Sequence, residues 1–333
     1  MAGKTILSVE NLSIDYYSSR GPVHAVRNVS FKLYDQENLC IIGESGSGKT
    51  TMGMALVKLS PPSAKITAGS ITYNLDGKEY PLHKMNEEQM RQFRWKQVAM
   101  VFQGALNAFN PVIRISEQFL ETGKAHGMNS ETEIMTRANE LLRFVQLDPN
   151  RVMNAYQHEL SGGMKQRVLI ALSLLLKPKI LIMDEATSAL DILTQRNIIN
   201  LLKQVKKEFG VSIIFVSHDL SLAAELADRV ITVYAGRMVE MAKTEDIFYR
   251  AIHPYTKGLI KATPTVTGED KDLSSIKGST PDLIKLPPGC KFKPRCEECN
   301  GQCSESEPEL VQAGDEHFVA CFKALPADCT KKE

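Results

Sequence analysis

Residues 43–50 read GESGSGKT, which matches the phosphate-binding loop pattern G-x-x-x-x-G-K-[ST] at every fixed position. The apolar run 39–42 precedes this stretch and an apolar-periodic segment follows it, so we predict a strand, a loop and a helix. In such a loop, backbone N–H groups surround phosphate, the lysine reaches the β- and γ-phosphates, and the hydroxyl of the last residue binds Mg²⁺. A glycine-rich turn that matches by chance is the alternative. The residues expected to contact nucleotide are Gly43, Ser45, Gly46, Ser47, Gly48, Lys49, Thr50 and Thr51.

Two further apolar runs, residues 180–183 and 212–216, predict buried parallel strands. Asp184 and Glu185 follow the first run, and His218 follows the second. Ligands bind beyond the carboxyl ends of strands in open α/β sheets, so we expect the three strand ends to converge on one site. There Asp184 would hold Mg²⁺, Glu185 would polarise the attacking water and His218 would bond a γ-phosphate oxygen. A solvated turn or helix cap for the acids, and a structural role for the histidine, are the alternatives.

The remaining pattern outlines the organisation of the chain. Residues 71–73 followed by Asp76-Gly77 predict a hairpin, and the apolar spacing of residues 6–14 predicts antiparallel strands beside it. Ser130 and Glu133 form a capping box before a helically periodic segment within a helical insert. Prolines and glycines accumulate after residue 250, so long helices are not expected there.

Composition limits the classes of function. Hydrophobic residues make up 43% and charged residues 24%, and the net charge is +1, which leaves no basic excess for binding nucleic acid. The longest apolar run, residues 168–176, is about half of the roughly 20 residues that cross a bilayer. The first residues contain no secretory signal, which predicts a cytoplasmic, reducing location. Six of the seven cysteines lie after residue 289, and in that location such a cluster is more often a metal site than a disulfide framework.

Residues 160–164 read LSGGM, and residues 180–191 read ILIMDEATSALD. Together with the loop, these motifs resemble the ATP-binding cassette superfamily over residues 1 to about 260. The resemblance implies an ATPase with an α/β fold. Its parts are a P-loop NTPase (RecA-like) core at 1–103 and 167–250 with an N-terminal antiparallel β subdomain, a helical subdomain at 104–166, and a small, loop-rich, metal-stapled C-terminal domain at 251–333.

The resemblance also assigns individual residues. Tyr16 would stack on adenine, with Tyr17 as the less favoured choice, and Gln103 would contact Mg²⁺ and the helical insert. Asp191 would lie in a loop that crosses between two subunits. In the head-to-tail dimer of the superfamily, the signature of one subunit closes on the ATP of the other, and hydrolysis lets the pair separate and moves attached transmembrane helices. The signature residues that would act in trans are Ser161, Gly162, Gly163 and Gln166.

HPYT at 253–256 and GCKFKPRC at 289–296 look like the dipeptide, oligopeptide and nickel importer subfamily. Its members work with a second ATPase subunit, related or identical, two transmembrane permease subunits and an external solute-binding protein, at the cytoplasmic face of the membrane. The loop FQGALNAFNP departs from the subfamily, which usually carries an acidic residue and a serine-leucine pair there. Nickel as cargo, a soluble ATPase without membrane partners, and an electron-transfer module are alternative functions.

The subfamily's cysteine spacing implies an iron-sulfur cluster, [4Fe-4S]. It maps onto Cys290, Cys296, Cys303 and Cys321. Four thiolates hold Zn²⁺ equally well, with His317 as a further candidate ligand, and Cys299 is an alternative fourth thiolate for a cluster. A metal-free loop is also possible.

Overall fold

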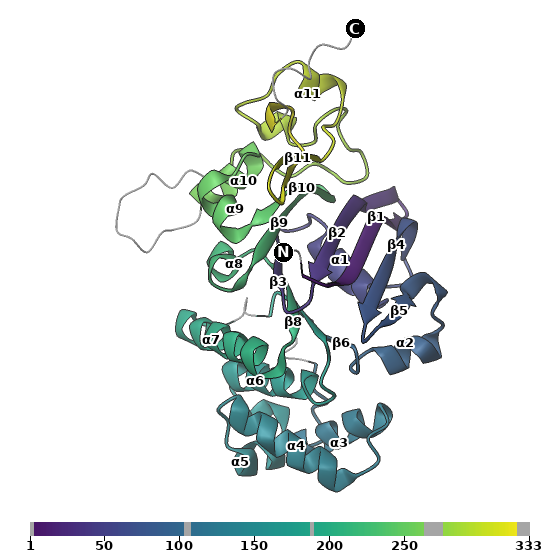
Figure 1. Ribbon diagram of the computed structural model, residues 1–333, viewed down its shortest axis with the longest axis vertical. Coiled ribbons are helices and arrows are strands. Elements are labelled where there is room, and N and C mark those ends of the chain that lie inside the picture. The colour runs from purple at the N-terminus through teal and green to yellow at the C-terminus, as the bar shows by residue number, and fades with distance from the viewer. Residues whose placement is uncertain (1–2, 103–107, 187–189, 263–275, 325–333) are drawn as a thin grey trace. The chain divides into compact units, whose positions relative to one another are not determined.

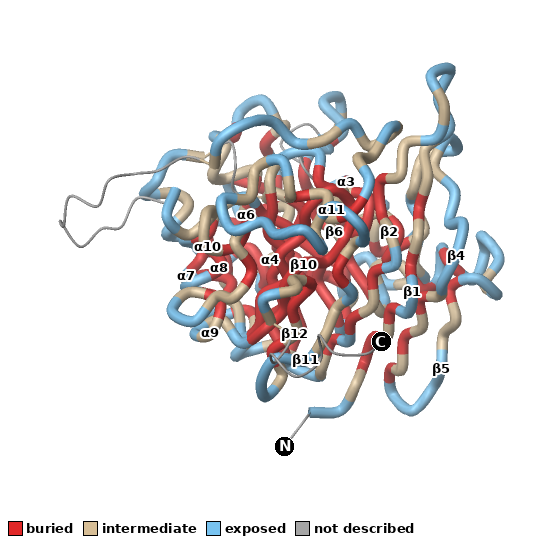
Figure 2. Tube along the Cα trace, turned by 90° about the horizontal axis from the view of Figure 1, so that it is seen from above, coloured by how far each residue is buried: buried red, intermediate tan, exposed pale blue. Residues whose placement is uncertain are grey.

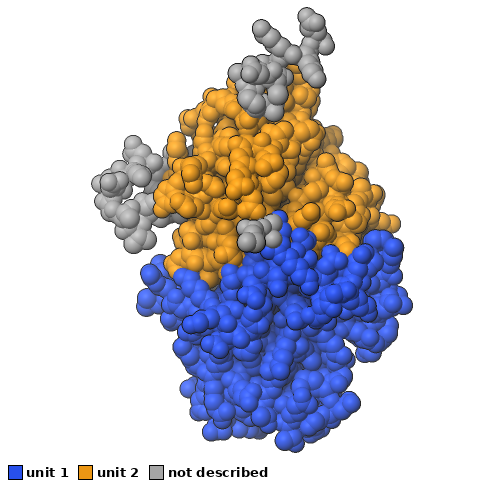
Figure 3. All heavy atoms as spheres, viewed as in Figure 1, with its two compact units in different colours: residues 1–6, 34–37, 73–215 blue, residues 7–33, 38–72, 216–333 orange. Residues whose placement is uncertain are grey.

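The computed structural model describes residues 3–102, 108–186, 190–262 and 276–324. The chain divides into two compact units, coloured separately in Figure 3. Unit 1 comprises residues 1–6, 34–37 and 73–215, and unit 2 comprises residues 7–33, 38–72 and 216–333. The domain boundaries expected after residues 103, 166 and 250 remain predictions.

Unit 2 contains a mixed sheet with the strand order β11-β12-β10-β9-β3. Strands β3 (Asn38–Ile42) and β9 (Arg229–Tyr234) are parallel and buried along their whole length, as expected for strands covered on both faces. Strand β10 (Arg237–Lys243) returns antiparallel to β9, and β12 (His317–Val319) and β11 (Val311–Gly314) extend the sheet beyond it. The cysteine-rich tail, described over residues 276–324, therefore adds the strands β12 and β11 to this core sheet.

A second sheet in unit 2 has the order β2-β1-β4, formed by β1 (Thr5–Ser18), β2 (Gly21–Tyr34) and β4 (Ala64–Leu75). The two-residue connection between β1 and β2 allows only antiparallel pairing. Buried and less buried positions alternate along these strands (Figure 2), as in a sheet with one face towards a core. The predicted N-terminal antiparallel strands are confirmed.

In unit 1, β6 (Val98–Val101) and β7 (Ile180–Asp184) are parallel, and β8 (Ser212–Ser217) lies on the other side of β7. The predicted hairpin forms between the end of β4 and β5 (Lys78–Pro81), and α2 (Glu87–Phe93) follows. Helix α7 (Ile192–Phe209) ends at Gly210, whose φ of 61° lets the chain turn out of the helix.

The helical part of unit 1 contains α3 (Ile115–Ala125), α4 (Glu131–Phe144), α5 (Pro149–Asn154) and α6 (Gly162–Ser173), which lie side by side in Figure 1. The Ser130 side chain accepts from the Glu133 N–H at the start of α4, which is the N-cap half of the predicted capping box. Arg137 on α4 donates to the carbonyl oxygens of Leu174 and Leu175 after α6. These bonds tie α4 to the end of the helix that begins in the LSGGM motif.

The helices of unit 2 are short: α1 (Lys49–Leu56), α8 (Leu220–Leu226), α9 (Thr244–Arg250), α10 (Pro254–Lys261) and α11 (Gln302–Glu305). Tyr234, Tyr255 and Phe292 form an aromatic cluster that joins β9, α10 and the tail. Across the described residues, none of the helices is both long and apolar enough to pass through a bilayer.

Candidate functional site

The glycine-lysine loop connects β3 to α1, as the sequence predicts. A Cβ atom on Gly48 would lie 2.0 Å from the carbonyl oxygen of Ala25, so only glycine fits at this φ of 98°. Lys49 is buried, and its Nζ donates to the carbonyl oxygens of Gly43 and Glu44 at 2.8 and 2.9 Å. The buried Ser47 hydroxyl has no hydrogen-bond partner within the described ranges. Such a loop concentrates N–H donors and one ammonium group around a space suited to phosphate.

Glu44, which occupies a variable position of the loop pattern, is held by the C-terminal part of unit 2. Its N–H donates to Tyr255 Oη at 2.8 Å, and its carboxylate accepts two hydrogen bonds from Arg295, at 2.6 and 2.8 Å. In the sequence, Tyr255 stands out only as part of the HPYT motif, and Arg295 only as part of the GCKFKPRC motif.

Tyr16 lies at the same loop, because its hydroxyl is 3.2 Å from Thr51 Oγ1 on α1. Tyr17 is 54% exposed, with Lys65 Nζ 5.5 Å from the centre of its ring. His218 is exposed and directly follows β8, in line with the predicted strand end. Which tyrosine stacks on adenine stays a prediction.

In unit 1, the acidic pair lies at the end of β7. Asp184 is the last residue of the strand and is buried, while Glu185 is partly exposed and has a φ of 46°. The left-handed region is uncommon for residues other than glycine and occurs often at active and switch sites. The two carboxyl groups therefore have different surroundings, as their different predicted roles require.

The LSGGM motif forms the start of α6. Ser161 is the N-cap residue, and its Oγ accepts from the Met164 N–H at 3.3 Å. A Cβ atom on Gly163 would lie 2.7 Å from Thr194 Cγ2, so the signature packs against the first turn of α7. Asp191 caps that turn by accepting from the N–H and hydroxyl of Thr194, and these hydrogen bonds lower the pKa of Asp191. Ile192 and Leu193 beside it are 81% and 77% exposed.

The predicted site residues thus fall into two sets. Unit 2 contributes Tyr16, the loop and His218, whereas unit 1 contributes Asp184, Glu185, the signature and Asp191. Convergence of the strand ends across the two sets stays a prediction. Gln103 lies outside the described residues.

The four cysteines assigned to a metal group line one small pocket of about 20 Å³ in unit 2, together with Lys293 and Lys323. Burial raises the pKa of Cys296 to about 11 and also raises the pKa values of Cys290 and Cys321. Neither Cys299 nor His317 lines this pocket, and His317 Nε2 lies 2.8 Å from Glu240. Over the described part of the chain, no three or more His, Cys, Asp or Glu side chains are arranged to hold a metal ion.

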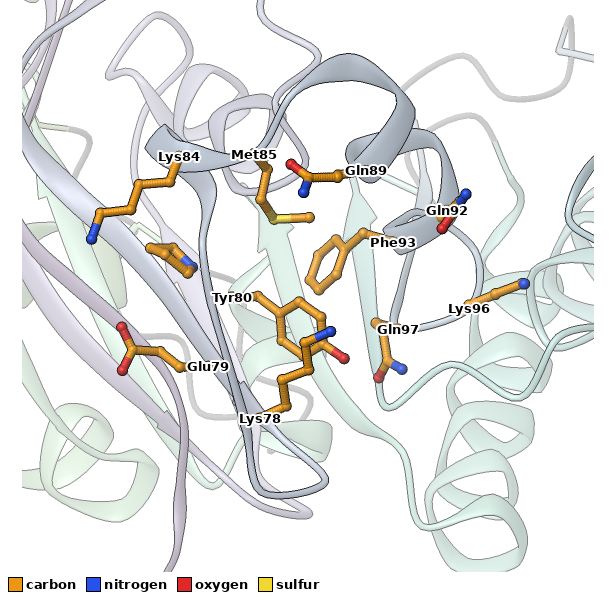
Figure 4. A pocket seen from close by; sticks show the side chains of 11 residues that line it. Lys78, Glu79, Tyr80, Lys84, Met85, Gln89, Gln92, Phe93, Lys96 and Gln97 are labelled. Carbon is orange, nitrogen blue, oxygen red and sulfur yellow. The ribbon is translucent and has the colours of Figure 1, made fainter.

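A pocket of about 400 Å³ in unit 1 contains none of the predicted nucleotide residues. It lies between β5 and α2, and Figure 4 shows Tyr80 and Phe93 facing one another inside a rim with several lysines. The two rings are 5.2 Å apart. The nucleotide motifs are therefore separate from this hollow.

Two family models match the chain. One, described as ABC transporter, matches residues 26–188, and one, described as Oligopeptide/dipeptide transporter, C-terminal region, matches residues 239–303. The chain is 44% identical to the dipeptide transport ATP-binding protein of Caldanaerobacter subterraneus subsp. tengcongensis, over 95% of this chain and 96% of the relative. It is 39% identical to the oligopeptide transport ATP-binding protein of Escherichia coli, over 96% and 94% of the two chains.

Solved structures agree with these relatives. A dimeric ATP-binding cassette in a post-hydrolysis state, bound to ADP and Pi, superposes with a TM-score of 0.63 at 29% identity, covering 72% of this chain and 99% of the other. A subunit of an ABC transporter complex from Clostridium perfringens superposes with a TM-score of 0.62 at 27% identity, covering 74% and 92%. The predicted α/β cassette fold is confirmed.

Proposed function

The chain belongs to the ABC transporter family as an ATPase subunit of the dipeptide and oligopeptide importer type, and from that premise we propose that it powers the uptake of dipeptides or oligopeptides. The similarity to peptide transport subunits, which extends through the HPYT motif and the tail, carries this proposal. The subunit would act at the cytoplasmic face of the membrane, on two permease subunits that receive cargo from an external binding protein.

In this proposal the two sets of residues divide the chemistry of ATP hydrolysis. Lys49 neutralises the β- and γ-phosphates; Thr50 and Asp184 would hold Mg²⁺, which would supply positive charge to the transferring phosphoryl group. Glu185 orients and polarises the attacking water, and His218 bonds the γ-phosphate. The buried Lys49 ammonium and the left-handed backbone of Glu185 support these roles.

A second cassette subunit completes the site. One chain already surrounds its own phosphates with residues 43–50, so the Ser161–Gly163 helix start serves the ATP bound to the partner. The exposed Ile192 and Leu193 beside Asp191 support a subunit contact at this end of α7. The dimeric state of the solved ADP-bound cassette agrees with this arrangement.

Glu185→Gln provides the test of the catalytic assignment. The variant is expected to bind ATP with native affinity, to lose turnover and to accumulate as an ATP-bound dimer, measured by nucleotide binding, phosphate release and size-exclusion chromatography. Lys49→Ala is the matched variant, which is expected to lose ATP binding itself. Hydrolysis by Glu185→Gln at the native rate would reject the role of Glu185.

We further propose that Cys290, Cys296, Cys303 and Cys321 hold a [4Fe-4S] cluster, with Zn²⁺ as the alternative occupant. The gathering of these four thiols at one pocket, away from Cys299 and His317, supports this ligand set. The thiols would have to draw together and lose their protons, because no metal-holding arrangement exists among the residues that the structure covers. Such a group would link the tail covalently where its own apolar core is small.

The test of this assignment is iron, sulfide and zinc content after anaerobic purification. Cys296→Ser is expected to lose most of the bound metal and Cys299→Ser to retain it. Equal metal loss in both variants would reject the ligand set, and protein free of metal would reject the site.

A further inference from the structure

We propose that Tyr255 and Arg295 are positioning residues for the phosphate-binding loop, through which the C-terminal part of unit 2 sets the affinity for nucleotide. The proposal concerns Glu44, the second residue of GESGSGKT, to which the hydrolysis scheme proposed above assigns no role. It rests on the assignment of residues 43–50 as the loop that binds ATP phosphates.

Glu44 is fixed from three directions. Its N–H donates to Tyr255 Oη at 2.8 Å, and its carbonyl oxygen accepts from Lys49 Nζ at 2.9 Å. Its side chain accepts two hydrogen bonds from the Arg295 guanidinium, at 2.6 and 2.8 Å. Lys49 Nζ is hydrogen-bonded to the Glu44 carbonyl oxygen. A displacement of the Glu44 backbone therefore also displaces the ammonium group that is expected to reach the phosphates.

Ring packing and a hydrogen bond hold Tyr255, and with it the hydroxyl group, in place. The ring is fully buried and packs against Tyr234 and Phe292, with ring centres 4.6 and 5.3 Å apart. Its N–H donates to His253 Nδ1 at 3.0 Å, which caps α10. Burial lowers the pKa of His253 to about 3, so this imidazole is neutral and able to accept. The HPYT motif thus supplies an anchored hydroxyl to the loop.

Arg295 supplies the second anchor. Its side chain is 4% exposed, and its Nε donates to the carbonyl oxygen of Lys277 at 2.9 Å, so the guanidinium orientation is set by the tail. The Glu44 carboxylate raises the pKa of Arg295, and paired, largely buried ions of this geometry are stronger than exposed ones. The ion pair joins residues 251 positions apart in the sequence.

The alternative is that the Arg295–Glu44 ion pair holds the tail in place and has no effect on the loop. Glu307 provides the comparison, because it docks the tail without contacting the loop: it accepts from Arg27 and forms ion pairs with Arg237 and Lys291. If docking alone mattered, breaking either set of ion pairs would have the same effect on nucleotide binding. If Glu44 positions the loop, only the Arg295 and Tyr255 contacts affect it.

The size of each expected effect depends on the kind of hydrogen bond that the substitution removes. Tyr255→Phe removes one neutral hydrogen bond and keeps the ring, so the Kd for ATP is expected to rise about fivefold. Arg295→Met removes a charge-assisted pair, and a rise of about tenfold is expected. The Glu44→Gln/Arg295→Met double variant should be no weaker than Arg295→Met alone, since both changes break one pair. Arg295→Lys should recover part of the affinity.

The experiment titrates Mg-ATP into the full-length chain by calorimetry, and measures KM and kcat for ATP in the assembled transporter. Thermal unfolding midpoints are measured for every variant. Tyr255→Phe and Arg295→Met are expected to raise KM by the same factors as Kd and to change kcat by less than twofold. Glu307→Gln is expected to lower the unfolding midpoint while keeping the Kd for ATP within twofold of the native value.

Two results would overturn the proposal. Native ATP affinity in both folded variants, Tyr255→Phe and Arg295→Met, would show that Glu44 does not control the loop. A loss of affinity in Glu307→Gln equal to that in Arg295→Met would show that tail docking alone matters. Lys49→Ala distinguishes failure of this inference from failure of the proposed function. Native ATP affinity in Lys49→Ala would overturn the assignment of residues 43–50 as the phosphate-binding loop, and the inference with it.

Discussion

Replacing Glu240 is expected to destabilise unit 2 strongly, because this carboxylate organises the segment that leads to Tyr255. Glu240 lies on β10 and is completely buried, with 0% exposure. It accepts from the N–H groups of Ile252 and His253 at 2.6 and 3.2 Å, and its Oε1 lies 2.8 Å from His317 Nε2. One side chain on β10 therefore holds the start of α10 and β12 together.

The magnitude follows from the number of polar groups that Glu240→Ala would leave buried. An unsatisfied buried donor costs about 1–3 kcal/mol, and three partners are affected. Relaxation and entry of water reduce the sum, so we expect a loss of about 3–5 kcal/mol in the free energy of unfolding, as for other broken buried charge networks. Glu240→Gln keeps the size and one acceptor oxygen, and a smaller loss of about 1–3 kcal/mol is expected.

The assay is guanidinium unfolding followed by far-UV circular dichroism, with thermal scans as a second measure. The matched control is Glu309→Ala, because Glu309 is an exposed carboxylate that pairs with Arg237 on the same sheet. Its loss is expected to cost no more than about 0.5 kcal/mol. A Glu240→Ala variant whose free energy of unfolding lies within 1 kcal/mol of the native value, roughly the size of one ordinary hydrogen bond, would show that Glu240 does not hold these segments together.

Two further predictions concern the loop and the helix next to the signature. Gly48→Ala is expected to abolish ATP binding, since its Cβ would lie 2.0 Å from the Ala25 carbonyl oxygen at a φ that disfavours alanine; native affinity measured by calorimetry would contradict this. The hydrogen bonds from Thr194 lower the pKa of Asp191 on folding, so its stabilising contribution is complete above the ordinary aspartate value of about 3.9 and is lost as pH falls through the folded value. Asp191→Ala should therefore lower the thermal midpoint at pH 7 and do so less at pH 3, and an equal difference at both pH values would count against this contribution.

Much of the site could be predicted from short stretches of sequence. The loop at 43–50, the apolar runs that became β3, β7 and β8, and the Ser130 cap each depend on residues a few positions apart. The spacing of such residues follows from local backbone geometry and burial, so it predicts both. The resemblance carried by LSGGM and the tail motifs then indicated the family, which the relatives confirm.

The sequence alone predicted which residues along the chain bind phosphate, hold Mg²⁺ and activate water. Only the tertiary structure showed that Arg295 and Tyr255 are hydrogen-bonded to Glu44. It also showed that Glu240 contacts His317, 77 positions away in the sequence, and that β12 pairs with β10 in the core sheet. A hydrogen bond between distant segments leaves no periodic pattern, because in the sequence either partner alone looks like any other polar residue. Such contacts depend on how the sheet and the tail pack, because the two partner residues come within hydrogen-bonding distance only after the chain has folded.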